Sequence, residues 1–497
     1  MSTRRGWEIL TEALQNSKLD LIVCTPGKPV TPVQDALVAS GHARWVNHEA
    51  IAAQYALGAS GCGDRAVLIV KQVGMNAATD VLACAAPHRT GGAMVVIAGD
   101  DPGATSSQVE GDSRKLATAI EVPCFEPAGC SDIPDTLYRA LEVSTLLKVP
   151  VVLRVTGPMM TSLGNDDEIR TKRVPSPSNP FDPSFWQTDF VGHRRLMLEA
   201  MYALPEESDF SLRRGDPAFR IVASGQLAAD VQAQSNYELF IVRRVFPHLS
   251  NALSDFVASS DSPILVLEES GVLVEDDVRG YASDQVIFGR RSGHVPWAGP
   301  IDVAASVTAA LRECPLVLDE PARYPGDPDA DLSPFGTLWT DAEDLGLTPI
   351  ATDAGHNGAA INLEGNPAPF SYGLGSSIGV AAGISLSKGG ASIAVIGDMG
   401  AFHNGLLGLV QAVRDQIPVI VFVDDDGGAM TTGGQPTPSA PAKSGECQES
   451  FADIARAVGV KHVETVTKES MTSEVLIVKL KELAGLSGPS VVVIDGK

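Results

Sequence analysis

The sequence predicts an α/β protein made of three doubly wound α/β domains. Short runs of β-branched residues alternate with stretches of helical length, which is typical of parallel sheets covered by helices. The 497 residues are too many for one hydrophobic core, and two Pro-rich stretches interrupt the alternation. We therefore divide the chain into a first domain (1–160), a linker (161–190), a middle domain (191–318), a linker (319–338) and a third domain (339–497).

Each domain has its own predicted strands. The first contains LDLIVCTP, RAVLIVK, AMVVIAGDD and VPVVLRV, and its helices are expected over 49–61, 78–86 and 132–147. The middle domain contains FRIVASGQLAADVQ, which predicts a strand, a glycine turn and a helix, followed by the strand SPILVLEES. The third contains the strands ASIAVIGD, IPVIVFVDD and PSVVVIDG. Strands separated by helices of this length indicate parallel sheets.

Composition and charge exclude several classes of protein. The net charge of −24 has no basic stripe within it, so the chain would repel phosphate backbones and no nucleic acid partner is expected. The longest apolar runs are too short to span a bilayer, and no apolar run follows the N-terminal arginines, so we expect neither a membrane partner nor a signal peptide. The seven cysteines lack metal-binding spacing, and their odd number argues against a full disulfide framework. We expect a cytoplasmic protein.

Two acidic groups follow buried strands in the third domain. Gly397 and Asp398 end the strand IAVIG, and Asp425 belongs to the cluster that ends VIVFV. The carboxyl ends of parallel strands share one edge, where α/β proteins bind ligands. Asp398, Asp425 and the Gly427 carbonyl would bind a Mg²⁺ that bridges a diphosphate, while Gly397 and Gly400 let backbone approach the phosphates. The alternative is a simple strand-to-helix turn capped by Asp398.

The motifs around these residues resemble those of thiamine-diphosphate enzymes. GDMGAFHNGLLGLVQAV and AMTTGGQP are similar to the α subunit of indolepyruvate ferredoxin oxidoreductase and to the wider 2-oxoacid:ferredoxin oxidoreductases. PGKP, NHEAIAAQYALGAS, KQVGMNAATD and GDDPGATSSQVEGDSR resemble that family's pyrimidine-binding domain. The resemblance covers most of the chain. It implies pyrimidine-binding, middle and diphosphate-binding domains, with thiamine diphosphate and Mg²⁺ as cofactors and a homodimer in which two subunits build one site.

The resemblance assigns roles to individual residues. Glu49 would be the catalytic acid beside N1′ of the aminopyrimidine, although the helix dipole also favours an acidic residue in a first turn. Ile378 would support the bent cofactor or, alternatively, lie in a helix core, and Met430 would contact the ring. The other cofactor-binding residues are Gly74, Asn76 and Met399.

Several basic side chains are candidates for the chemistry. His403 and His88 are candidates for proton transfer, and a structural or surface role explains His88 equally well. His48 and His356 are further candidates to line the site. Lys28, in CTPGKP, would face an anionic group of the substrate or, alternatively, be a solvated loop lysine.

Three features depart from that family. The first is the lack of cluster cysteines: we find no C-x-x-C motif and no cysteine-rich ferredoxin domain, and YPGD at 324–327 stands where the family has CPGC. The second is Lys28, where the family often has threonine or another small residue, and the third is Asp425, where it has asparagine. We therefore expect a lyase that performs non-oxidative decarboxylation, or carboligation, of a 2-oxo acid through an enamine bound at C2. One alternative is the catalytic subunit of an indolepyruvate-like 2-oxoacid oxidoreductase with a separate redox subunit. The other is a non-catalytic cofactor-binding scaffold.

Overall fold

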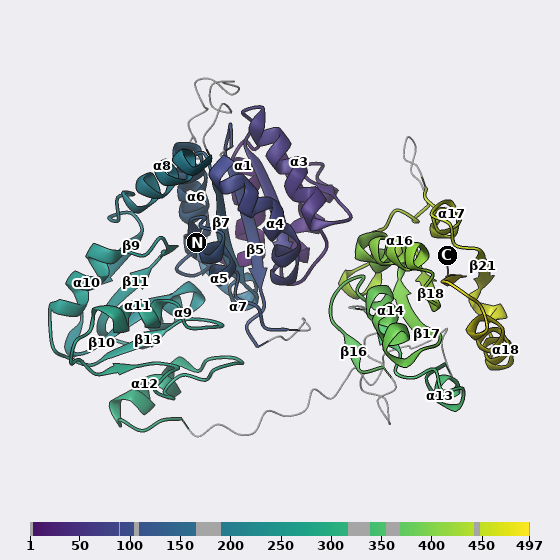
Figure 1. Cartoon of the computed structure of the whole chain (residues 1–497). Helices are drawn as coiled ribbons and strands as arrows, with labels where there is room; N and C mark the ends of the chain where they lie inside the picture. Colours follow the sequence, from purple (N-terminus) through teal and green to yellow (C-terminus); the bar gives the residue numbers. More distant parts are fainter. Residues whose placement is uncertain are drawn as a thin grey trace. The chain divides into compact units, whose positions relative to one another are not determined.

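The chain forms two compact units, residues 1–319 and 320–497, in a computed structural model (Figure 1). The structure describes residues 3–88, 90–103, 109–165, 190–316, 338–353, 368–441 and 448–496. The first unit contains two large sheets and the second contains one, each with helices between its strands, and each unit also contains one two-stranded sheet. The predicted α/β class is confirmed.

The first sheet has seven strands in the order β12-β6-β7-β5-β4-β2-β3. All its pairs are parallel except β12–β6. The central strands β4, β5 and β7 are buried almost throughout, which explains their continuous apolar runs. The strands are β2 (Leu21–Cys24), β3 (Arg44–Trp45), β4 (Ala66–Lys71), β5 (Met94–Asp100), β6 (Cys124–Phe125), β7 (Pro150–Thr156) and β12 (Arg244–Phe246).

The helices of the first domain agree with the prediction in two places and extend it in a third. The predicted helix over 49–61 is α3, and that over 132–147 is α6. The helix predicted over 78–86 begins six residues earlier, because α4 follows β4 without a loop. The helices are α1 (Gly6–Asn16), α2 (Thr31–Ala39), α3 (Glu49–Gly61), α4 (Gln72–His88), α5 (Ser113–Ala119), α6 (Ile133–Leu147) and α7 (Gly157–Thr161).

The termini of the first domain pair with one another. Strand β1 (Thr3–Arg5) lies antiparallel to β8 (Leu163–Asn165), which falls inside the stretch predicted as a linker. The rest of that stretch, 166–189, lies outside the described residues, as does most of the predicted linker at 319–338.

The second sheet has five strands in the order β14-β13-β10-β11-β9. Its predicted strand, glycine turn and helix are confirmed as β10, Gly225 at a φ of 63° and α9. Strand β12 leaves the middle domain to pair with β6 of the first sheet, so the two domains share one sheet. The elements are α8 (Phe190–Tyr202), β9 (Phe210–Arg213), β10 (Asp216–Ser224), α9 (Gly225–Gln234), β11 (Tyr237–Val242), α10 (Ser250–Ala258), β13 (Ile264–Leu267), α11 (Val274–Tyr281), β14 (Ile287–Phe288) and α12 (Val303–Leu311).

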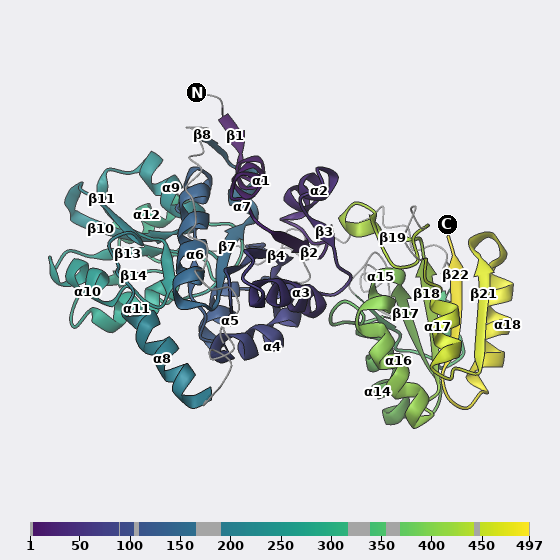
Figure 2. The ribbon, with the colours of Figure 1, turned by 90° about the horizontal axis from the view of Figure 1, so that it is seen from above.

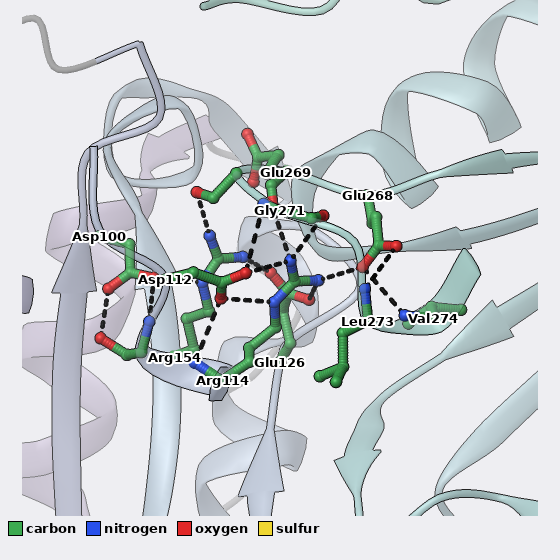
Figure 3. A network of polar contacts seen from close by, with 12 residues as sticks. Asp100, Asp112, Arg114, Glu126, Arg154, Glu268, Glu269, Gly271, Leu273 and Val274 are labelled. Atoms are coloured by element: carbon green, nitrogen blue, oxygen red, sulfur yellow. Dashed lines mark hydrogen bonds and ion pairs between the residues drawn. The ribbon is translucent and has the colours of Figure 1, made fainter. Parts of the chain in front are cut away.

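A buried ion network joins the first and second sheets (Figure 3). The side chains of Arg114 and Arg154 are fully buried. Arg114 Nη1 lies 2.8 Å from Glu268 Oε2, which follows β13 of the middle domain. Arg154 Nε lies 2.6 Å from Asp100 Oδ2, and Arg154 also pairs with Glu126. Two buried arginine side chains therefore pair with carboxylates from both domains, away from solvent.

The second unit contains six parallel strands in the order β16-β15-β17-β18-β22-β21. Two apolar cores lie against this sheet, one with α13 and α18 and the other with α14, α16 and α17. Figure 2 shows the helices α14, α16, α17 and α18 around the sheet. The strands are β15 (Ala351–Thr352), β16 (Phe370–Ser371), β17 (Ser392–Gly397), β18 (Val419–Asp425), β21 (His462–Thr467) and β22 (Ser490–Asp495). The helices are α13 (Leu338–Asp344), α14 (Ser377–Lys388), α15 (Asp398–Gly400), α16 (Leu406–Asp415), α17 (Phe451–Ala457) and α18 (Ser473–Ala484).

The three predicted strands of this unit are confirmed as β17, β18 and β22, whereas β21 was not predicted. The strand β21 has the sequence HVETVT and lies at the edge of the sheet with no fully buried residue, so it lacks the continuous apolar run of its neighbours. A short hairpin, β19 (Gly428–Ala429) with β20 (Gln435–Pro436), follows β18. No helix in the described part of the chain is long and apolar enough to cross a membrane.

Candidate functional site

Two buried carboxylates meet at the carboxyl edge of the third sheet. Asp398 follows β17 and opens α15, and Asp425 ends the adjacent parallel strand β18. Their exposed fractions are 3% and 4%. The hydroxyl of Ser439 lies 2.6 Å from Asp425 Oδ1 and 3.1 Å from Asp398 Oδ2. One serine oxygen therefore links the two acidic groups that the sequence proposed as metal ligands.

Two hydroxyl residues of this site were missed by the sequence reasoning. Thr437 donates a hydrogen bond of 2.6 Å to Asp398 Oδ2, and Ser439 is the linking serine. Both follow the β19–β20 hairpin, which returns the chain to the strand ends. Both belong to the turn that closes with a hydrogen bond of 3.0 Å from Ala440 N to the Thr437 carbonyl, and no pattern in the sequence pointed to them.

The acidic cluster that ends β18 divides between the two faces of the sheet. Asp425 faces Asp398, whereas Asp426 Oδ1 lies 3.3 Å and Asp424 Oδ1 3.8 Å from Lys468 Nζ. Successive side chains of a strand point to opposite faces, which explains the division. Only Asp425 of the three therefore lies with Asp398.

The buried Asp398 carboxylate would be stabilised by a bound cation. Burial and, to a smaller extent, the charge of Asp425 raise the pKa of Asp398, and hydrogen bonds from Thr437, Ser439 and the Met399 N–H lower it, so that it lies at about 6. Two carboxylates that are buried away from solvent, with hydroxyl groups beside them, provide the hard oxygen ligands that Mg²⁺ prefers. This donor set fits Mg²⁺. Gly427 lies in the same turn with a φ of 71°, and its carbonyl accepts a weak hydrogen bond from Thr437 N at 3.5 Å.

A third carboxylate at this edge was also missed. Asp353 follows β15 and is 1% exposed. A Cβ on Gly400 would lie 2.0 Å from Asp353 Oδ2, so the space left by this glycine is occupied by a carboxylate. The Gly375 N–H donates to the same oxygen at 3.3 Å. Gly397 faces open space, as a backbone that approaches a ligand requires.

The remaining predicted residues of the second unit differ in burial. Ile378 is fully buried in the α14 core, which agrees with its alternative role in helix packing. Met399 is buried within α15, and Met430 is 51% exposed on the turn after β19. His403 is 6% exposed and lies in the π-helical turn Ala401–Gly405, where its ψ of −112° breaks the helix directly after Asp398–Gly400. His356 lies outside the described residues.

In the first unit, Glu49 opens α3 and is 6% exposed. The preceding His48 caps the helix, and its Nδ1 accepts a hydrogen bond of 3.1 Å from Ala50 N. Gly74 of α4 packs directly on the glutamate, since a Cβ there would lie 2.7 Å from Glu49 Oε1. Asn76 is exposed on α4. The structure therefore brings Gly74 to Glu49 and leaves Asn76 on the helix surface.

Two predicted basic residues of the first unit lie in different surroundings. Lys28 is exposed in the loop after β2, close enough to Lys71 to influence its charge. His88 is the exposed last residue of α4, and its Nδ1 lies 2.7 Å from the Cys84 carbonyl. His88 is separated from Gly74 by roughly 20 Å of helix. This placement favours the structural role of His88 over proton transfer.

Comparison with known proteins identifies relatives for most of the chain. Residues 360–494 match the family model "Thiamine pyrophosphate enzyme, C-terminal TPP binding domain". Over 93% of its length the chain is 27% identical to indolepyruvate oxidoreductase subunit IorA of Methanothermobacter marburgensis and 28% identical to that of Methanothermobacter thermautotrophicus, and it covers 81% of each. The predicted resemblance is thus confirmed, as is the thiamine diphosphate domain.

One solved structure of low similarity was also found. It is a 2-oxoglutarate:ferredoxin oxidoreductase from Magnetococcus marinus with 2-oxoglutarate, coenzyme A and succinyl-CoA bound. The match has a TM-score of 0.45 and 11% identity, and it covers 63% of this chain and 64% of that one.

The relatives correct one expectation. They are named oxidoreductase subunits, so the prediction that the chain is a decarboxylase or carboligase of the lyase class was wrong. That prediction rested on the absence from this sequence of the cysteines that bind iron–sulfur clusters in the family. Electrons can leave through a different subunit, so the cysteine content of one chain does not decide between oxidative and non-oxidative chemistry.

Proposed function

We propose that this relative of the indolepyruvate oxidoreductase subunits is the thiamine-diphosphate-binding catalytic subunit of a 2-oxo acid oxidoreductase. The observation that carries the proposal is the buried pair Asp398 and Asp425, at the ends of adjacent parallel strands inside the matched thiamine pyrophosphate domain. A pair of buried carboxylates without a cation is costly, and Mg²⁺ with a diphosphate supplies that cation.

The second unit would bind the diphosphate end of the cofactor. Asp398, Asp425 and the Gly427 carbonyl would hold Mg²⁺, while Thr437 and Ser439 orient the carboxylates through their hydrogen bonds. Met399, Gly397 and Gly400 would lie along the phosphates at the start of α15. His403, buried directly after this turn, would move protons at the reacting carbon.

The first unit would bind the pyrimidine end. When bound, thiamine diphosphate supplies the carbon nucleophile that attacks the keto group and the electron sink that lets CO₂ leave. Glu49 would hold a proton at N1′ of the aminopyrimidine, in a position set by its place at the start of α3 and by the space above Gly74. Lys28 would attract an anionic substrate to this edge.

The substrate and the electron acceptor follow from the relatives' names. We propose an aryl 2-oxo acid of the indolepyruvate type as the substrate. Loss of CO₂ leaves the rest of the substrate at the oxidation level of an aldehyde. Its oxidation to the acyl level releases two electrons to an acceptor, and the acyl group is then transferred to water or to a thiol co-substrate. Because the relatives are named as subunits of an oxidoreductase, we propose that a separate redox subunit with one-electron carriers accepts these electrons.

We also propose a homodimer. On α3, the helix that Glu49 opens, Ile51 and Tyr55 are 41% and 52% exposed and lie one turn apart. On α16, Leu407 and Val410 are 67% and 44% exposed. Apolar faces on helices next to the candidate residues suit a second copy of the chain, and symmetric dimers are the commonest oligomers.

The deciding experiment is anaerobic turnover of a panel of 2-oxo acids by the purified chain with thiamine diphosphate and Mg²⁺. We expect CO₂ release only when a one-electron dye such as a viologen is added, with two dye molecules reduced per CO₂. The matched control is Glu49→Gln, which should bind the cofactor and reduce no dye. Aldehyde formed at the same rate without an acceptor would contradict the proposal.

A further inference from the structure

Four charged side chains gather at the carboxyl edge of the first sheet. Lys71 ends β4, and its surroundings include the charges of Asp101 after β5, Glu49 at the start of α3 and Lys28 after β2. Lys71 did not emerge from the sequence as a site residue. Such folds bind ligands at the carboxyl edge of the parallel sheet, so the charged side chains there are candidates for contact with a ligand.

The fold holds the Lys71 stem in place. A Cβ on Gly27 would lie 2.9 Å from Cβ, Cγ and Cδ of Lys71, so the glycine leaves the space through which the stem passes. The fully buried Gln34 ties the same loop to β4, because its Nε2 donates to the carbonyls of Thr25 at 2.8 Å and Ile69 at 3.1 Å. The position of the Lys71 stem is therefore fixed by β4 and by the loop that follows the adjacent strand β2.

The Lys71 ammonium is partly buried. Burial lowers its pKa and the charge of Lys28 lowers it further, while Asp101 and Glu49 oppose the shift. Within the part of the chain that the structure describes, no hydrogen bond or ion pair to the Lys71 ammonium is formed. Asp101 and Glu49 lie near enough to influence its charge, but among the described residues neither forms an ion pair with it, so its N–H groups are left for an anionic ligand.

We propose that Lys71 binds the carboxylate of the 2-oxo acid substrate. This inference rests on the proposed function, in which Glu49 binds the pyrimidine, and it goes beyond it by naming the group that recognises the substrate's acid. Thiamine diphosphate carries its own anion at the end of the molecule remote from the pyrimidine, so a cation beside Glu49 is placed for the substrate instead. Lys28, exposed on the adjacent loop, supplies long-range attraction, whereas Lys71 makes the contact.

The test compares Lys71→Met with Lys71→Arg and with Lys461→Met, an exposed lysine of the second unit. Methionine keeps most of the stem that passes Gly27 and removes the charge. For each variant we would measure kcat and KM for the 2-oxo acid with a viologen acceptor, the Kd for thiamine diphosphate with Mg²⁺, and hydrogen–deuterium exchange at C2 of the cofactor.

We expect Lys71→Met to raise KM by about 10- to 100-fold, as the loss of a charge-assisted hydrogen bond should. The cofactor Kd and the C2 exchange rate should stay at the wild-type values, and Lys71→Arg should recover part of the KM. Lys461→Met should match the wild type. An unchanged KM in Lys71→Met would overturn the inference, as would a weakened cofactor Kd at constant KM, which would assign Lys71 to the diphosphate. A wild-type protein without dye reduction would instead refute the proposed function.

Discussion

Gly74 leaves the space that the Glu49 side chain occupies. A Cβ at residue 74 would lie 2.7 Å from Glu49 Oε1 and 2.8 Å from its Cγ, closer than side-chain contacts allow. Alanine at this position would force the glutamate to rotate, although alanine itself favours the helix. We expect Gly74→Ala to lower turnover and C2 exchange by about 100-fold, since small displacements of catalytic groups have effects of this size.

The matched control for that change is Gly280→Ala. Gly280 lies within α11, and a Cβ there would meet nothing within 4 Å. This variant should keep full activity and gain up to about 1 kcal/mol of stability. Equal activity of the two alanine variants would contradict the assignment of Glu49.

Removal of the Asp398 carboxylate should abolish metal-dependent cofactor binding. In Asp398→Ala the remaining acidic groups face the diphosphate without a bridging ion, and we expect the affinity to fall by about 100-fold or more. Isothermal calorimetry with thiamine diphosphate and Mg²⁺ measures this. The control is Asp426→Ala, whose carboxylate faces Lys468 on the other side of the sheet. If only Asp426→Ala lost affinity, the metal would bind on the Lys468 side of the sheet, and our assignment to Asp398 would be wrong.

The Ser439 hydroxyl should tune that metal site. It touches both Asp398 and Asp425, so Ser439→Ala removes an orienting hydrogen bond without removing a charge. We expect a cofactor affinity about 10- to 100-fold weaker, the usual effect of losing such a supporting group. A titration of cofactor affinity against Mg²⁺ concentration should show that saturation requires more metal. Ser470→Ala, an exposed serine, is the control, and identical titrations for the two variants would refute the role of Ser439.

The ion network of the first unit should make stability depend on pH. Burial raises the pKa of Glu269 from 4.5 to about 7, and the charge of Glu126 adds to the shift while Arg154 opposes it. The folded state then holds a proton that the unfolded state releases. Its stabilising contribution, at most about 3 kcal/mol, is present below pH 4.5 and is lost as the pH rises through 7.

Thermal unfolding of wild type and Glu269→Gln between pH 4.5 and 8 measures this effect. Glutamine imitates the protonated acid, so the variant should lose less stability than the wild type as the pH rises. Burial raises the pKa of Asp100 and Glu268 as well, and the comparison of the two proteins cancels their contributions. Parallel stability curves would show that Glu269 is ionised throughout.

The dimer proposal predicts that charge on α3 separates the subunits. Ile51→Glu with Tyr55→Glu places two carboxylates on the exposed apolar face of this helix. Light scattering should show a dimer for the wild type and a monomer without activity for the variant. Leu196→Glu changes an apolar residue on α8 with 47% exposure and should leave the dimer intact. An active wild-type monomer would refute the proposal.

The sequence alone determined those features that depend on neighbours along the chain. The runs that became β4, β17 and β18 are apolar throughout because both faces of a parallel strand are covered, and such runs are read directly. Asp398 and Asp425 were found in the same way, since each directly follows its strand. Comparison with relatives, rather than any of these patterns, corrected the class of reaction.

Only the tertiary structure decided the features that join distant segments. Ser439 reaches the two carboxylates because a hairpin returns it there, and Asp353 fills the space beside Gly400 from a strand almost fifty residues earlier. Strand β12 joins the first sheet, and the charge of Glu49 acts on Lys71, for the same reason. Hydrophobic periodicity reports which face of an element is buried, but not which other element covers it, and that choice is made by packing across the whole chain.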